Sequence, residues 1–236
     1  ENAYAGGNTA TGSYNTAIGK DALTQNTSGA YNTTLGAFAA DAITTGSNNT
    51  AVGYNSLTVA TTGDSNTAIG HQALLLNTTA SNNTAVGYQA GYSNTTSAGN
   101  VFLGYFAGNA STGASNTYVG SGAGYLMTTG ARNTILGQFS GNQGGYDFRT
   151  SSNHIFLSDG DGNVRLYLSD TGDLVVPRVY SATTSNSANV QVDSVGIFRR
   201  STSSRRYKNT ISDATHGLTE LLALRPVTYK GNNDGD

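Results

Sequence analysis

The chain has 236 residues, a formal net charge of −2 and only 11% charged residues, so nothing in its charge indicates a nucleic-acid partner. It has no cysteine, which excludes disulfides and thiolate metal sites, and no segment approaches the ~20 apolar residues of a membrane span. Large apolar side chains are scarce, so a single copy has little with which to offset its conformational entropy. We expect order to come from repetition and from partner chains, with no cofactor and no membrane insertion.

A short phrase, Asn-Thr-Ala-Val/Ile-Gly, recurs at a nearly constant interval of seventeen residues through the first part of the chain. It begins at Asn15, Asn49, Asn66 and Asn83, and looser copies begin at Asn2, Asn32, Asn100, Asn116 and Asn133. So short and regular a period is typical of a solenoid, in which each repeat forms one coil that stacks on the next. The sequence therefore predicts an all-β fold, with a parallel β-roll of about nine coils over residues 1–145.

Each repeat, numbered from its asparagine, has a fixed apolar pattern, with glycine at position 5 and a small residue at position 8. Position 4 is aliphatic, and we expect its residues to form the structural core: Ile18, Leu35, Val52, Ile69, Val86, Leu103, Val119 and Leu136. Threonine, valine and isoleucine favour a strand here, and position 3 is apolar in most copies as well. A strand that is apolar on both faces is buried on both faces. One face can fill the coil and the other needs a neighbouring chain, which predicts a homotrimer about an axis.

Two further positions of the repeat have architectural roles. Asparagines stacked one coil apart can hydrogen-bond each other in a ladder, and the glycine at position 5 allows a close approach of two backbones or a positive φ. The whole phrase resembles the head repeats of YadA-like trimeric autotransporter adhesins, which form a left-handed parallel β-roll. The resemblance covers residues 1–145, where the period is longer than is usual in the adhesins and Asn-Thr replaces their typical start. Viral fibres use similar repeats, so the resemblance implies a fold rather than a biological role.

Residues 146–202 no longer follow the period and are expected to form a β-rich connector. A last echo of the repeat stands at Asn153–Leu157. The residues His154–Ser158 and Val164–Ser169 alternate as in a β-hairpin, joined by the turn Asp159–Asn163. Beyond them we expect a second turn and three further short strands, at Asp170–Asp173, Leu174–Tyr180, Val190–Asp193 and Gly196–Arg200.

The turn Asp159–Asn163 begins like the calcium loop of an EF-hand. The sixth place, where that loop needs glycine, is Val164, and Asp170 stands where a bidentate glutamate belongs. Because the flanking segments are strands rather than helices, we interpret it as a hairpin turn. The histidines His71, His154 and His216 have no partners at ligand spacing, so we expect no metal site.

Charge and helix signals return near the C-terminus, where Ser212 or Asp213 can cap a leucine-rich helix that ends before Pro226. The phrase before this helix, together with the helix and the strand after it, resembles the start of the intramolecular chaperone domain of endosialidase-type phage tailspikes. The matching residues are Ser203, Arg206, Lys208, Ile211, Leu218, Leu221, Leu224, Arg225–Val227 and Tyr229, whereas Ser204 stands where the family commonly has aspartate. Residues 203–236 would then be the N-terminal part of a chaperone, a short α+β piece.

That resemblance implies self-cleavage between Thr202 and Ser203, with Ser203 as the nucleophile and Lys208 as the assisting base. The chemistry is consistent, because a serine hydroxyl needs a base and a lysine with a lowered pKa can provide one. Repulsion among the basic residues between Arg199 and Lys208 would lower the pKa of Lys208. From the residues alone, a solvated basic linker is the alternative.

Three classes of function fit this sequence to different degrees. The leading hypothesis is a trimeric phage tail fibre or tailspike in the virion tail, which binds a host cell-surface receptor, either a glycan or a surface protein. The alternative is a bacterial autotransporter-type adhesin on the cell surface, which a coiled-coil stalk and membrane anchor after Asp236 would favour, whereas further chaperone helices would favour the phage. An enzyme acting on polysaccharide needs paired carboxylates, which are scarce among residues 1–145. The chain opens inside a repeat, and we expect it to be a fragment.

Overall fold

The computed structural model describes residues 11–177, 190–192 and 198–200. The chain divides into two compact units between Ser181 and Ala182. In the second unit, β14 (Val190–Val192) and β15 (Phe198–Arg200) pair antiparallel, at the two places where the sequence predicts strands. The described residues contain strands and no helix, so the predicted all-β class is confirmed.

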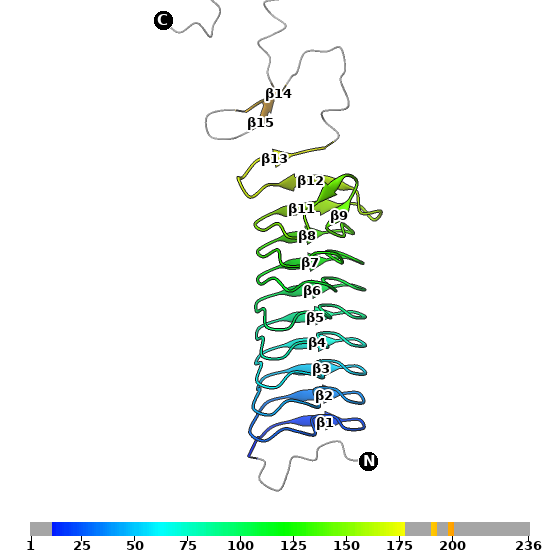
Figure 1. Cartoon of the computed structure of the whole chain (residues 1–236), viewed down its shortest axis with the longest axis vertical. Helices are drawn as coiled ribbons and strands as arrows, with labels where there is room; N and C mark the ends of the chain where they lie inside the picture. The colour runs from blue at the N-terminus through cyan, green and yellow to red at the C-terminus, as the bar shows by residue number, and fades with distance from the viewer. Residues whose placement is uncertain (1–10, 178–189, 193–197, 201–236) are drawn as a thin grey trace, which may run out of the picture. The chain divides into compact units, whose positions relative to one another are not determined.

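The first unit is a parallel β-solenoid with one short strand in each coil, and the coils stack in a column (Figure 1). The repeat strands are β1 (Thr16–Ile18), β2 (Thr33–Leu35), β3 (Thr50–Val52), β4 (Thr67–Ile69), β5 (Thr84–Val86), β6 (Val101–Leu103), β7 (Thr117–Val119) and β8 (Thr134–Leu136). Each strand pairs in parallel with the next, and equivalent positions lie opposite each other, as Ala51 does with Thr34 and Ala68. The predicted β-roll is confirmed over these coils, while the copy at Asn2 lies outside the described residues.

The strands are short because the residues on both sides of each strand turn the chain. The residue before each ladder asparagine, and before the equivalent His154, has a left-handed backbone even where it is not glycine, with φ between 57° and 63° at Tyr14, Tyr31, Asn48, Ser65, Asn82, Ser115, Arg132 and Asn153. After the strand, the glycine at position 5 has a positive φ and also touches the next coil. A Cβ on Gly70, whose φ is 132°, would lie 2.7 Å from the carbonyl carbon of Gly87. Both roles expected of this glycine are therefore present together.

The interior of each coil is lined by positions 3, 8, 9 and 12 of the repeat. Position 8 is small throughout and is buried in every described repeat but the last, as at Ala73 and Ala90, whereas Ser140 is partly exposed. In several coils positions 3 and 9 compensate each other in volume: Ala68 is matched by Leu74 in its coil, whereas Phe102 is matched by Gly108. Where both positions are small, as at Ala85 and Gly91, side chains of the neighbouring coils, Leu74 and Phe102, fill the space, which keeps the interior closely packed.

The eight position-4 residues predicted as the structural core are not in the core of the single chain. The structure turns position 3 inward and position 4 outward, so that Ile18 is 58% exposed and Leu103 is 44% exposed, while Val52 is partly exposed. The physical reason is strand alternation, which places neighbouring side chains on opposite faces, so that with position 3 inside the coil position 4 must lie outside it. Burial of position 4 against another chain stays a prediction.

The predicted asparagine ladder is present and runs the full height of the solenoid. The side-chain oxygen of each asparagine accepts the backbone N–H of the equivalent residue in the next coil, at 2.8 to 3.1 Å, from Asn15 through Asn133. The last rung is His154, whose backbone N–H donates to Asn133 at 2.9 Å. Most of the side-chain amides also donate within their own coil, as Asn49 does to the carbonyl of Gly63 at 2.9 Å. The ladder therefore satisfies buried polar groups of the backbone and of the asparagines themselves in every described coil.

The sheet continues beyond the regular repeats. The strand β11 (Ile155–Ser158) pairs in parallel with β8, with Phe156 opposite Ile135, so the echo in the sequence forms one more coil strand. The strands β12 (Val164–Leu168) and β13 (Leu174–Val175) then add to the same sheet in antiparallel order, which confirms the predicted hairpin. The expected boundary at residue 145 thus marks the end of the seventeen-residue period, and the sheet runs past it.

Between β8 and β11 the chain forms a small hairpin that we did not predict from the sequence. Its strands are β9 (Asn142–Gln143) and β10 (Tyr146–Asp147), and they pair antiparallel. The turn residues Gly144 and Gly145 both have positive φ, the backbone that a two-residue hairpin turn requires. The Gly-Gly pair was a visible signal, and the hairpin it forms lengthens this coil.

Candidate functional surfaces

Three features of the described residues are candidates for function: an exposed aliphatic strip, a stack of aromatic rings, and a hollow where that stack ends. The predicted cleavage site is not among them, because Thr202, Ser203 and Lys208 lie outside the described residues. The part of the chain that the structure describes also contains no cluster of three or more metal-ligating side chains. Within the same residues, no helix is long and apolar enough to span a membrane.

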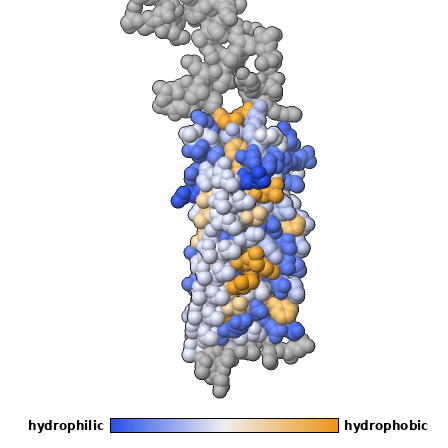
Figure 2. Space-filling model, viewed as in Figure 1, coloured by the Kyte–Doolittle hydropathy of each residue, from blue (hydrophilic) through white to orange (hydrophobic). Residues whose placement is uncertain are grey.

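The aliphatic strip is the outward face of the sheet at position 4. The strand registers align its residues in one row: Ile18, Leu35, Val52, Ile69, Val86, Leu103, Val119, Leu136 and Leu157. At about 4.8 Å per coil the row is roughly 38 Å long, and neither it nor the adjoining threonine-rich row at position 2 contains a charged residue. Apolar residues also appear in patches along the face of the column that Figure 2 displays.

A second row, at position 6, carries the aromatic stack. The rings of Tyr54, His71, Tyr88 and Tyr105 stand one coil apart, with centroids 5.4, 5.1 and 5.4 Å apart and planes within 20° of parallel. Such stacked ring pairs stabilise a fold by more than the burial of their apolar area alone provides. The seventeen-residue spacing of these four rings is visible in the sequence. The stack was not predicted because the repeat pattern was defined by positions 3 to 5 and 8, and the rings stand at position 6.

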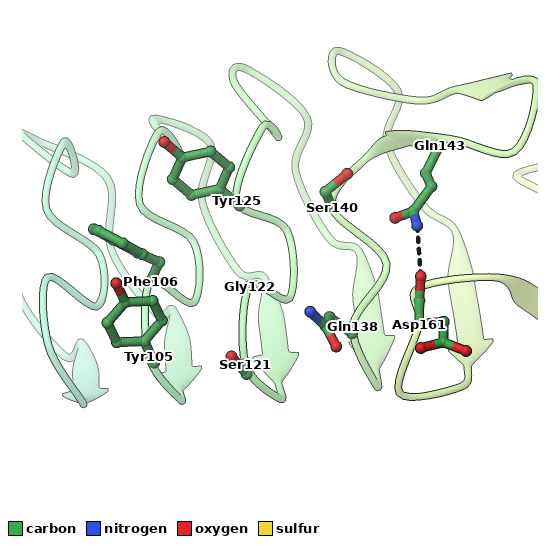
Figure 3. A pocket seen from close by; sticks show the side chains of 9 residues that line it. All are labelled: Tyr105, Phe106, Ser121, Gly122, Tyr125, Gln138, Ser140, Gln143 and Asp161. Atoms are coloured by element: carbon green, nitrogen blue, oxygen red, sulfur yellow. Dashed lines mark hydrogen bonds between the residues drawn. The ribbon is translucent and has the colours of Figure 1, made fainter.

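The stack ends at Tyr105, and a hollow begins there. The equivalent residues of the next two coils are Ser121 and Gln138, so the row supplies no further ring to cover the outer face of Tyr105 in the described coils. The hollow has a volume of about 270 Å³ and is lined by Tyr105, Phe106, Ser121, Gly122, Tyr125, Gln138, Ser140, Gln143 and Asp161. Figure 3 shows its two sides, with aromatic rings toward one end of the column and polar side chains toward the other. These residues come from three successive coils and from two hairpins.

The aromatic side of the hollow is a packed cluster. Phe106 lies 4.3 Å from Tyr105 and 5.4 Å from Tyr125 between ring centroids, and its ring is steeply inclined to both. Tyr105 is 55% exposed and Tyr125 is 40% exposed, so the cluster presents ring surface to solvent while Phe106 braces it. An apolar wall of fixed geometry results.

The polar side depends on the two hairpins. The amide of Gln143 donates to the backbone carbonyl of Asp161 at 2.6 Å, which ties the β9–β10 hairpin to the β11–β12 turn. Gly162 has a φ of 81°, which favours glycine, and a Cβ there would displace the amide of Gln143. Gln138 is placed by its backbone N–H, which donates to the carbonyl of Asp159 at 3.3 Å.

The turn that carries Asp161 is organised by Asp159. The Asp159 carboxylate accepts the backbone N–H groups of Asp161 and Asn163, at 3.0 and 2.9 Å, and pairs with the guanidinium of Arg165. Partial desolvation opposes ionisation of Asp159, but the hydrogen bonds from Asn163, Arg165 and Asp161 outweigh it and lower its pKa to about 2. Both carboxylate oxygens are thus engaged within the turn, in agreement with our interpretation of this loop as a hairpin turn.

Comparisons of the chain with protein-family models, with curated proteins and with solved structures found no match. Function is therefore inferred from the geometry of these surfaces and from the phrases in the sequence. The fold itself defines the class of protein: a parallel β-solenoid with a period of seventeen residues, ended by an antiparallel hairpin.

Proposed function

We propose that this chain is the shaft of a homotrimeric viral tail fibre or tailspike, which works outside the cell and attaches to a host cell surface. The observation that supports the trimer is the uncharged aliphatic strip that spans the repeat coils and β11. An apolar strip of this length is seldom left in water, and parallel sheets are normally covered on both faces. Two more copies about a threefold axis along the column would cover each strip with an equivalent surface in register.

The proposal includes the C-terminal segment, residues 203–236, as part of an intramolecular chaperone. Its support is the resemblance of the phrase around Ser203 and Lys208 to tailspike chaperones. Parallel solenoids consist of non-local pairings and fold slowly, and three of them must also find a common register. A chaperone that assists this step and is then released by cleavage before Ser203 suits such a molecule.

Attachment fits the described surface better than hydrolysis of a polysaccharide. Glycoside hydrolysis commonly uses two carboxyl groups on either side of the bond that breaks. The hollow at the end of the aromatic stack is lined by one carboxylate, Asp161, among neutral polar and aromatic residues. A surface of this composition can hold a ligand without cleaving it.

The trimer is tested by sedimentation and light scattering of the wild-type chain and of two charged variants. Val52→Asp and Ile69→Asp each place a carboxylate in the strip, where burial without a partner costs several kcal/mol, so both should be monomeric. Thr62→Asp is the matched control, because Thr62 is exposed in the polar half of the repeat that contains Val52, and this variant should remain a trimer. A folded wild-type monomer at high concentration would overturn the proposal.

A further inference from the structure

The hollow beyond Tyr105 has the height that one further stacked ring would occupy. Tyr105 and Gln138 belong to coils two steps apart, which corresponds to about 9.6 Å along the column. The rings already in the stack are spaced by 5.1 to 5.4 Å. One six-membered ring placed over Ser121 would therefore contact Tyr105 on one side and Gln138 on the other.

The floor of the hollow leaves room for such a ring. Ser121 and Gly122 replace the aromatic pair Tyr105 and Phe106 of the coil before them. Gly122 is open as well, since a Cβ there would meet only the Cγ atom of Gln138, at 3.9 Å. A volume of about 270 Å³ is just below the range of sites for drug-sized ligands, which begins near 300 Å³, so it suits one small ring rather than a long chain.

The side chains around this space favour a ring that carries hydroxyl groups. The face of Tyr105 carries negative charge density and attracts the weakly positive C–H bonds of a stacked ring. The amides of Gln138 and Gln143 offer both donors and acceptors, and the hydroxyls of Ser121 and Ser140 can do either. A purely aromatic ring would bury these amides and hydroxyls without forming hydrogen bonds to them, which costs binding free energy. A pyranose has C–H bonds on its faces and hydroxyls at its edge, and so matches both sides.

The charge of the hollow narrows the class of sugar. Among the described residues that line it, Asp161 is the one carboxylate and none is a cation. The guanidinium of Arg165, on the same turn, is paired with Asp159. An anionic sugar would meet a like charge without a compensating cation, which disfavours it. The lining therefore selects a neutral pyranose.

We propose that the hollow is a binding site for one neutral pyranose residue, at the end or at a branch of a cell-surface glycan, stacked on Tyr105 and hydrogen-bonded by Gln138 and Gln143. The inference rests on the proposed attachment function and names its ligand class and its site. A single small site binds weakly, but three copies on one trimer would add avidity without further contacts. The receptor is then recognised by several weak sites together.

The experiment is a saturation-transfer NMR titration of the wild-type chain with the methyl glycosides of glucose, galactose, mannose and N-acetylglucosamine. At least one should bind at millimolar concentration. Tyr105→Ala should weaken that binding about tenfold through loss of the stacking face, whereas Tyr105→Phe should keep it. Ser121→Tyr should abolish binding, because the new ring would occupy the hollow as the next rung of the stack.

Tyr54→Ala is the matched control, since it removes a stacked ring at the far end of the stack and should leave binding unchanged. The assignment is overturned if no glycoside binds, if binding persists in Ser121→Tyr, or if p-cresol, a stand-in for a tyrosine side chain of a protein partner, binds more tightly than every sugar. Sedimentation of the same samples separates the two proposals. A trimer that binds no sugar would overturn only the proposed sugar site. A monomer that binds sugar would overturn only the proposed trimer.

Discussion

The ring of Phe102 occupies the space that a side chain at Gly108 would need. Both residues belong to one coil, and Phe102 is completely buried. A Cβ built on Gly108 would overlap three carbons of the ring, and the φ of Gly108 is +60°. Leucine occupies the position of Gly108 in an earlier coil, at Leu74, with a similar φ of 50°, so it is the ring of Phe102 rather than the backbone alone that requires glycine at Gly108.

Gly108→Ala should destabilise the solenoid by about 2 to 5 kcal/mol. The left-handed backbone costs an alanine about 1 to 2 kcal/mol, and overpacking against Phe102 adds about 1 to 3 kcal/mol. The measurement is urea denaturation followed by circular dichroism. Gly99→Ala is the control, because Gly99 has φ of +73° but its Cβ would come no closer than 3.6 Å to a neighbouring atom. Equal losses in the two variants would show that the ring can move aside.

The sequence was sufficient to predict the coils but not which face of the strand points inward. A fixed period forces equivalent residues to stack, so the ladder from Asn15 to Asn133 and the role of the position-5 glycine could be predicted. Positions 3 and 4 are both apolar, and strand alternation alone does not decide which of the two faces the interior of the coil. One signal for the inward face was the joint change to Phe102 and Gly108, which appears only when two positions of a coil are compared with those of other repeats.

The hollow was harder to predict because it forms where the repeat breaks down. Its aromatic side follows from the spacing of the stacked rings, and the change to Ser121 was visible in the sequence. Its polar side comes from Gln143 and Asp161, which reach the hollow through two hairpins outside the period. Their positions depend on the β9–β10 turn and on the hydrogen bonds around Asp159. The seventeen-residue period does not predict either feature.

Asn66→Ala should cost about 2 to 6 kcal/mol, since it leaves two buried backbone groups unpaired at about 1 to 3 kcal/mol each. The Asn66 side chain accepts the N–H of Asn83 at 3.1 Å and donates to the carbonyl of Ala80 at 2.8 Å. Asn77 provides a control in the same coil, because its buried amide has no hydrogen-bond partner within the described residues. Asn77→Ala should change the free energy of unfolding by less than about 1 kcal/mol. Similar losses in both variants, measured by denaturation, would mean that burial and not the ladder is responsible.

Acid should loosen the β11–β12 turn before it affects the coils. The pKa of Asp159 is about 2 in the folded chain, against an ordinary value of 3.8. A carboxylate with a lowered pKa stabilises the fold above its unfolded value, and that contribution disappears as the pH falls from about 4 toward 2. The protection of the backbone amides of Asp161 and Asn163, taken as their exchange rate relative to that of an unstructured peptide at the same pH, should therefore fall in this interval. In Asp159→Asn the protection should be low already at pH 4 and change little down to pH 2, and unchanged protection in the wild type would contradict this prediction.

The last prediction concerns the proposed cleavage between Thr202 and Ser203. In the full-length protein, intact-mass analysis should find a shaft that ends at Thr202 and a released fragment that begins at Ser203. Ser203→Ala removes the nucleophile and Lys208→Ala removes the base, so each should leave an uncleaved but assembled trimer.

Ser204→Ala is the control for that experiment, because it alters the adjacent hydroxyl and should be processed normally. Release of the chaperone also removes the element that helps refolding, so the cleaved trimer should unfold more slowly on heating than the uncleaved Ser203→Ala trimer. Solenoid strands pair across coils seventeen residues apart, and three unfolded chains must also find their common register again. Refolding without the chaperone is therefore slow. Normal processing in both active-site variants, or a fragment that begins at another residue, would show that Ser203 and Lys208 have been assigned the wrong roles.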